Sequence, residues 1–245
     1  MTGTIAALVG SAGGVGTSRL TVECGATLAR AGWTVALFDA SFATPGLDRY
    51  VPGSIQPDLT SLLTGGCQLQ DALYDSELDV PGRLAICPAS APFARRSTAM
   101  TADAARQFEQ QLASSSLTFD AVLVDTPPVA GNQALAAVNA AERVAVVTED
   151  STRGLDALAS TRDVLADVGV SPTMTVANRA GDGEVAADVS IPDAALGPAR
   201  NGPECLSPDE AFAPAIGETV EQLYGVSLDL EYSGGGRLGG LLGRS

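Results

Sequence analysis

The chain has no lysine and no histidine among its 245 residues, and all 14 of its basic residues are arginine. The lack of histidine excludes a Ser-His-Asp triad and a histidine-based metal site. The four cysteines form no Cys-x-x-Cys pair, so we interpret them as buried, reduced thiols rather than zinc ligands or a disulfide framework. Aromatic residues make up only 4% of the chain, so its core must be built from Ala, Val, Leu and Ile.

Positive charge is scarce: 29 acidic residues against 14 arginines give a formal net charge of -15. Such a surface repels a duplex, so we expect no nucleic-acid partner unless the arginines cluster. This acidic, lysine-free composition resembles that of proteins from extremely halophilic archaea. In molar salt the Debye length is only about 3 Å, which screens the self-repulsion.

Long apolar runs are absent as well, since none reaches the roughly 18 residues that cross a bilayer. We therefore expect a cytoplasmic protein, at most peripheral at the inner face of the membrane. Residues 229–245 form a glycine-rich tail, for which two interpretations stay open. It is either a flexible end or a weak membrane-targeting segment that uses three leucines and two arginines.

What is present is an alternation of short apolar runs and helical patterns. The runs that predict strands are residues 4–9, 34–38, 84–87, 121–124, 144–148 and 173–177. Helical patterns cover residues 18–31, 58–63, 69–74, 102–112, 132–141, 154–168 and 208–223. This order predicts one domain over residues 1–228, a three-layer α/β/α fold with a mostly parallel central sheet.

Polar residues recur where the predicted strands end, at Gly10, Asp39, Asp125 and Asn178. Open parallel sheets bind their ligands at this edge. The segment Gly10–Arg19 reads Gly-Ser-Ala-Gly-Gly-Val-Gly-Thr-Ser-Arg and lies between a predicted strand and helix. It has the form of a P-loop, whose backbone N–H groups surround phosphates at a helix N-terminus.

Several motifs in chain order resemble the MinD/ParA family of deviant Walker P-loop ATPases. The Gly-Gly-Val-Gly loop comes first, and Val-Ala-Leu-Phe-Asp over residues 35–39 is similar to the second strand and first switch. Phe-Asp-Ala-Val-Leu-Val-Asp-Thr-Pro-Pro over residues 119–128 resembles the Walker B strand and second switch. Val-Ala-Asn-Arg over residues 176–179 resembles the segment that contacts adenine. The resemblance implies a P-loop NTPase-like fold and a dimer around ATP or ADP with Mg²⁺.

The resemblance also implies site residues. The implied nucleotide-binding residues are Gly13, Gly14, Val15, Gly16, Thr17, Ser18, Arg19, Asn178 and Arg179. The implied Mg²⁺ residues are Ser18, Asp39 and Asp125. For the two aspartates a second interpretation stays open, in which they only cap strand ends and order the switch loops.

Three charged positions of the family are neutral in this chain. The signature lysine falls on Ala12, the general P-loop lysine on Thr17, and the water-positioning aspartate on Ser41. Arg19 cannot replace the second lysine, because two residues along a helix turn its side chain about 200° away. We therefore predict weak nucleotide binding at most, hydrolysis near background and no catalytic residue.

The leading hypothesis is a degenerate MinD/ParA-like pseudo-ATPase that regulates intracellular positioning, such as cell division or the placement of a surface structure. Its expected partner is a protein, in a homodimer or in a heterodimer with an active paralogue. The alternatives are an unconventional ATPase that cycles on the membrane and a chromosome or plasmid partition factor. Arg95 and Arg96 are interpreted as a solvated loop pair, with an anion contact as the alternative.

Overall fold

The computed structural model describes residues 2–181, 183–193, 202–206 and 211–232. Its strands are β1 (Thr4–Gly10), β2 (Thr34–Asp39), β3 (Tyr74–Asp75), β4 (Arg83–Cys87), β5 (Ala121–Thr126), β6 (Arg143–Glu149), β7 (Met174–Ala180) and β8 (Val189–Pro192). Its α-helices are α1 (Thr17–Arg30), α2 (Leu59–Leu63), α3 (Phe93–Ala99), α4 (Ala102–Ser115), α5 (Asn132–Ala140), α6 (Thr152–Asp167) and α7 (Phe212–Tyr224). Three 3₁₀ helices are η1 (Leu47–Tyr50), η2 (Leu69–Asp71) and η3 (Glu204–Leu206).

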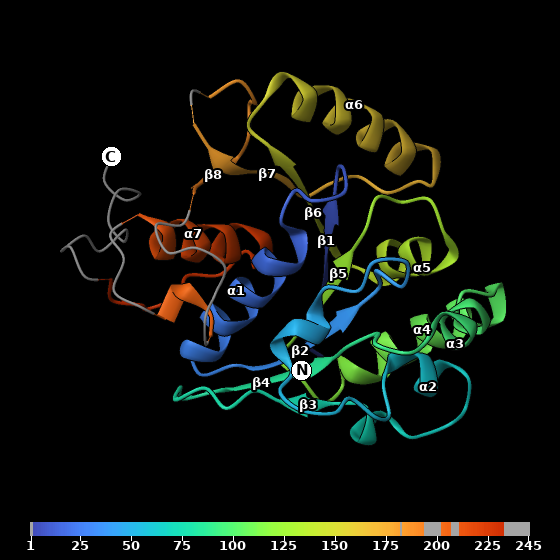
Figure 1. Ribbon diagram of the computed structural model, residues 1–245. Coiled ribbons are helices and arrows are strands. Elements are labelled where there is room, and N and C mark those ends of the chain that lie inside the picture. The colour runs from blue at the N-terminus through green and yellow to red at the C-terminus, as the bar shows by residue number, and fades with distance from the viewer. Residues whose placement is uncertain (1, 182, 194–201, 207–210, 233–245) are drawn as a thin grey trace.

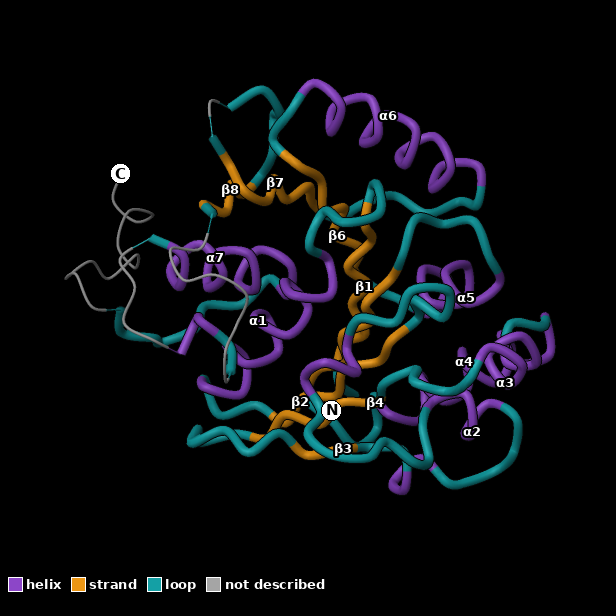
Figure 2. Tube along the Cα trace, viewed as in Figure 1, coloured by secondary structure: helices purple, strands orange, loops and turns teal. Residues whose placement is uncertain are grey.

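The strands form one sheet in the order β3-β4-β2-β5-β1-β6-β7-β8, and every pairing is parallel except that of β3 with β4. Helices α1 and α7 lie on one side of the sheet and α4, α5 and α6 on the other, as Figure 1 shows. Figure 2 shows the strands running through the middle of the molecule between these two groups. The predicted three-layer α/β/α architecture with a mostly parallel sheet is therefore confirmed.

Side chains that alternate in direction along each strand fill the core on both faces of the sheet. In β1, Ala6 and Leu8 pack with α1 and α7, whereas Ala7 and Val9 pack with residues of α5 and α6. Because successive side chains of a strand point to opposite faces, a central strand must be apolar at every position. The continuous apolar runs of the sequence have this cause.

The local prediction was wrong at three places. The helix predicted at residues 69–74 is the short η2 followed by β3, and β8 and α3 were not predicted at all. Strands β3 and β8 lie at the two ends of the sheet and are short, so their sequences carry too little periodicity to reveal them. The last helix begins at Phe212, and residues 207–210 of its predicted start lie outside the described residues.

The structure divides the predicted tail. Of residues 229–245, the first four are described, and there the Arg30 guanidinium lies 5.2 Å from the centre of the Tyr232 ring. The Tyr232 hydroxyl packs against Gly217 of α7, where it would lie 2.0 Å from an added Cβ atom. Residues 233–245 lie outside the described part of the chain. None of the helices described is both long enough and apolar enough to cross a membrane.

Candidate functional site

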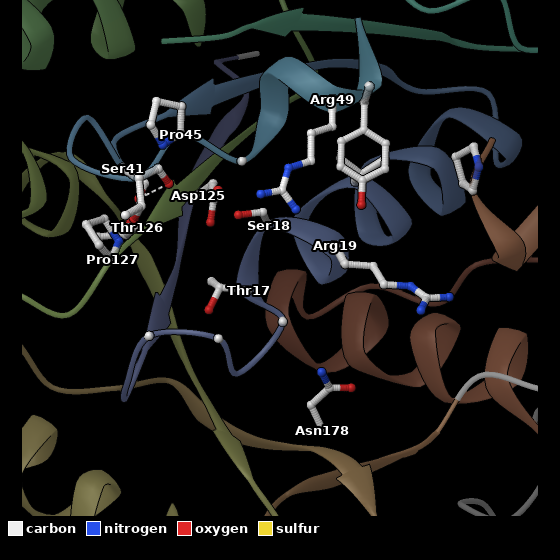
Figure 3. A pocket seen from close by; sticks show the side chains of 18 of the residues that line it. Thr17, Ser18, Arg19, Ser41, Pro45, Arg49, Asp125, Thr126, Pro127 and Asn178 are labelled. Carbon is white, nitrogen blue, oxygen red and sulfur yellow. Dashed lines mark hydrogen bonds between the residues drawn. The ribbon is translucent and has the colours of Figure 1, made fainter. Parts of the chain in front are cut away.

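The ends of the central strands surround a cavity of about 1120 Å³. Its lining includes the P-loop, the end of β5 at Asp125, the first-switch segment (residues 40–47) and Asn178. The sequence had placed all of these at this edge. Figure 3 shows the labelled side chains around this space. Ligand pockets commonly enclose about 300–1,000 Å³, so the space is sufficient for a nucleotide.

The P-loop has the backbone shape that its glycines predicted. Gly14 and Gly16 have φ angles of 87° and 94°, in the left-handed region that favours glycine. An added Cβ atom on Gly13 or Gly14 would meet nothing within 4 Å, so the loop is open on its outer side. Helix α1 starts at Thr17, and its N-terminus therefore adjoins the cavity, where its dipole favours an anion.

Thr17, at the position of the P-loop lysine, is turned back toward the strand. A Cβ atom placed on Gly10 would lie 2.6 Å from the Thr17 hydroxyl. The side chain is therefore packed over Gly10 and presents no charge to the cavity.

Asp39 and Asp125 lie in register on the adjacent strands β2 and β5. Burial raises the pKa of both carboxyls, that of Asp125 to about 6, and the charge of Asp125 raises the pKa of Asp39 further. Asp39 accepts backbone hydrogen bonds from Ser41 at 2.9 Å and from Gly46 and Leu47 at 3.1 Å. Both of its oxygens thus hold the first-switch segment, the role that the second interpretation gave it.

Asp125 has the features of a metal ligand. It is 2% exposed, and its Oδ2 atom is buried without a hydrogen-bond partner. Burial is the larger effect on its pKa, and the nearby Ser18 hydroxyl acts in the opposite direction and lowers that pKa. A carboxylate oxygen beside a P-loop hydroxyl fits Mg²⁺, which takes a few protein oxygens and completes its shell with water and phosphate. The described residues contain no cluster of three His, Cys, Asp or Glu side chains that would hold a metal by themselves.

Gly46 brings the first-switch segment against the P-loop helix. A Cβ atom at this position would lie 2.1 Å from the Ser18 hydroxyl oxygen and 3.5 Å from the Asp125 carboxylate. The sequence analysis overlooked this glycine, because a glycine after a proline is also typical of an ordinary turn.

Substitution of Gly46 by Ala is expected to destabilise the protein by about 1–3 kcal/mol, because the added methyl group must displace Ser18 or the switch segment. Denaturant unfolding would measure the loss. Gly181→Ala is the matched control, since a Cβ atom there meets nothing within 4 Å. Equal stability of the two variants would contradict the close packing of Gly46 on Ser18.

Ser41, at the position of the water-positioning aspartate, is bonded within its own loop. Its hydroxyl lies 2.9 Å from the carbonyl oxygen of Thr44 and 3.2 Å from the hydroxyl of the same residue. The side chain offers no carboxylate to an attacking water. Ala12 also lines the cavity and adds no polar side-chain atom.

Asn178 and Arg179 support the P-loop from β7. The Asn178 side-chain amide donates to the Val15 carbonyl at 2.8 Å, and an added Cβ atom on Gly16 would lie 2.4 Å from that amide nitrogen. Arg179 donates to Glu149 at 2.8 Å and to the Gly14 carbonyl at 3.4 Å. Its own φ of 55° places it in the left-handed region. Both side chains thus contact the loop and also line the cavity.

Arg19 is directed toward η3 and α7, away from Thr17 (Figure 3). Its guanidinium lies 2.5 Å from Glu204 and 3.6 Å from Glu23, and it stacks on Phe212 at 5.3 Å. This is the direction that the helical angle predicted.

Arg95 and Arg96 were predicted as a solvated loop pair, but they lie in helix α3, where Arg95 is exposed and Arg96 is partly buried. Arg95 donates to the Ser61 hydroxyl at 3.1 Å and lies 4.0 Å from the buried Asp58. Arg96 donates to the carbonyls of Phe42 at 2.7 Å and Ala43 at 3.1 Å, which fixes the first-switch segment to α3. Because α3 was not predicted, these arginines could not be placed beside the switch from the sequence.

A P-loop before helix α1, two aspartates at the ends of adjacent strands and an asparagine on β7 define the class of the domain, a P-loop NTPase fold. Residues 3–170, more than half of the chain, match a family model described as AAA domain (AAA_31). The chain therefore belongs to this family of AAA domains.

Several solved structures are similar to this fold. The cell division ATPase MinD of Pyrococcus furiosus is 22% identical with a TM-score of 0.77, and the match covers 90% of this chain and 98% of MinD. The septum site-determining protein MinD of Pyrococcus horikoshii OT3, solved with Mg-ADP, is 22% identical with a TM-score of 0.67 over 79% of this chain and 82% of that one. At these identities the likeness establishes the MinD-like fold.

One curated relative is similar in sequence to about half of this chain. The tyrosine-protein kinase ptk of Acinetobacter johnsonii is 33% identical over 120 residues, which are 49% of this chain and 16% of the kinase. The match thus spans only a small part of the kinase.

Proposed function

We propose that this protein is a MinD/ParA-like pseudo-ATPase that binds a nucleotide without turning it over and acts as a regulatory protein in intracellular positioning. One observation carries the proposal: the backbone of the P-loop is intact while the three charged family positions are Ala12, Thr17 and Ser41. The hydroxyls of Thr17 and Ser41 are directed to neighbouring protein atoms. The site thus keeps the parts that hold phosphate and lacks those that promote its transfer.

Binding has its own support in the described residues. The open P-loop glycines and the α1 N-terminus offer N–H donors to phosphate, and the orphaned Asp125 oxygen with Ser18 offers Mg²⁺ ligands. The MinD of Pyrococcus horikoshii, which has this fold, was solved with Mg-ADP. When bound, Mg²⁺ would neutralise phosphate charge at this edge of the sheet.

The fixed switch segment supports the proposal of regulation through a protein partner. Asp39, Arg96 and Gly46 hold residues 40–47 against the body of the protein. A switch that is held in one conformation presents a constant surface, which suits a binding protein better than a cycling enzyme. The proposed partner is a second copy of the chain or a MinD/ParA paralogue with intact lysines. The two MinD proteins are a cell division ATPase and a septum site-determining protein, which supports positioning as the process.

The proposal is tested by calorimetric titration of the purified protein with Mg-ATP and Mg-ADP in high salt, with Ser18→Ala as the control. We expect saturable binding of both nucleotides by the wild type and weaker binding by the variant, because Ser18 supplies a metal-ligand hydroxyl. Absence of binding by the wild type would reject a nucleotide-dependent role. Co-elution with a paralogue only when ATP is present would support the heterodimer.

A further inference from the structure

Three arginines line the cavity: Arg19, Arg49 and Arg179. Two of them are committed to carboxylates, Arg19 to Glu23 and Glu204 and Arg179 to Glu149. Arg49 is exposed, and within the described ranges it forms no ion pair. Of these three arginines, Arg49 is therefore the one whose guanidinium is available to a ligand.

The position of Arg49 is fixed by the fold. It belongs to η1, in which Leu47 is fully buried and Tyr50 packs against the same core cluster. In a 3₁₀ helix residues three apart share a face, so Leu47 and Tyr50 anchor η1 while Arg49 faces another direction. Asp39 holds the start of η1 through the Leu47 N–H, and Gly46 holds it close to Ser18.

The direction that remains for Arg49 is into the cavity. Figure 3 shows its side chain extending from η1 toward Ser18 and Asp125, on the opposite side of the site from Asn178. Burial and the charge of Glu23 raise the pKa of the Tyr50 phenol, whereas the nearby charges of Arg19 and Arg49 lower it, so both arginines lie close to this ring. A positive group thus reaches the P-loop helix N-terminus from the switch side and not from the loop itself.

We propose that Arg49 is the cation that contacts the polyphosphate of the bound nucleotide, in place of the lysines that the loop lacks. This inference rests on the proposed nucleotide binding. Arg49 restores one positive charge for binding, and its planar guanidinium forms paired hydrogen bonds to phosphate oxygens. It supplies no replacement for the carboxylate absent at Ser41, so the site holds the nucleotide without positioning an attacking water.

The test compares the wild type, Arg49→Ala, Arg49→Lys and the matched control Arg153→Ala in calorimetric titrations with Mg-ATP and with inorganic tripolyphosphate. Arg153 is an exposed arginine on α6 and does not line the cavity, so its loss changes the net charge equally. We expect Arg49→Ala to weaken the binding of both ligands by about tenfold or more, since a hydrogen bond to a charged group contributes about 1.5–3 kcal/mol. Arg49→Lys should retain part of the affinity, and Arg153→Ala should match the wild type.

Several outcomes would overturn the inference. Unchanged affinity in Arg49→Ala would remove Arg49 from the site while leaving the proposed function intact. A loss for ATP but not for tripolyphosphate would assign Arg49 to the base or the ribose. A similar loss of affinity in Arg153→Ala would show that the effect comes from the change in net charge and not from a contact made by Arg49. If the wild type bound neither ligand, the proposed function would fail together with this inference. Unfolding curves of the variants check that Arg49→Ala keeps the wild-type fold.

Discussion

The purified protein is expected to release no phosphate from Mg-ATP above a buffer blank, even after long incubation in high salt. A single cationic group in phosphoryl transfer can change the rate by about 10³–10⁵. In the proposed pseudo-ATPase, Ala12 stands for the signature lysine and Ser41 for the water-positioning aspartate, and the Ser41 hydroxyl is bonded to Thr44. A colorimetric phosphate assay over several hours would measure the result.

The converse experiment restores the missing groups. The triple variant with Ala12→Lys, Thr17→Lys and Ser41→Asp is expected to exceed the wild type by at least about 10³-fold, because it restores two cations and one carboxylate beside the Asp125 edge. Sustained phosphate release by the wild type that disappears in Ser18→Ala would contradict the pseudo-ATPase proposal. Release that persists in Ser18→Ala would instead indicate a contaminating ATPase.

The second large effect is the pH dependence of stability that Asp125 produces. Burial raises its pKa from 3.8 to about 6, so the folded state binds the proton more tightly than the unfolded state does. The contribution of Asp125 to the free energy of unfolding is therefore greatest below pH 3.8, and it falls as the pH rises through about 6. The loss amounts to about 3 kcal/mol at pH 8, because each tenfold difference in proton affinity between the two states corresponds to about 1.4 kcal/mol.

Asp125→Asn is expected to remove this penalty and to be more stable than the wild type at pH 8 when a chelator removes divalent cations. The advantage should shrink toward pH 4, where the wild-type carboxyl is protonated. Denaturant unfolding at a series of pH values and constant salt measures the difference. Asp103→Asn, at an exposed carboxylate of α4, controls for the general reduction in negative charge. A stability difference between Asp125→Asn and the wild type that did not change with pH would contradict the assignment.

Most of the architecture could be predicted because its information is local. The strands of the sheet centre are continuous apolar runs, and the P-loop is a contiguous segment with three glycines. The end strands were missed because β3 has two residues and β8 has four, lengths at which a period of two is not recognisable. The contacts of Arg95 and Arg96 could not be predicted, since their partners lie in segments brought together only by folding.

The sequence by itself determined the fold class and the glycine-rich loop, because both depend on which residues follow one another. It also indicated that Asp39, Asp125 and Asn178 would meet, since parallel strands end at a common edge. Only the tertiary structure decided what these residues do there. It joined Asp39 to the switch segment, left one oxygen of Asp125 without a partner and brought Arg49 from a separate helix to the cavity. The physical reason is that hydrogen-bond partners and burial are set by contacts between segments far apart in the chain.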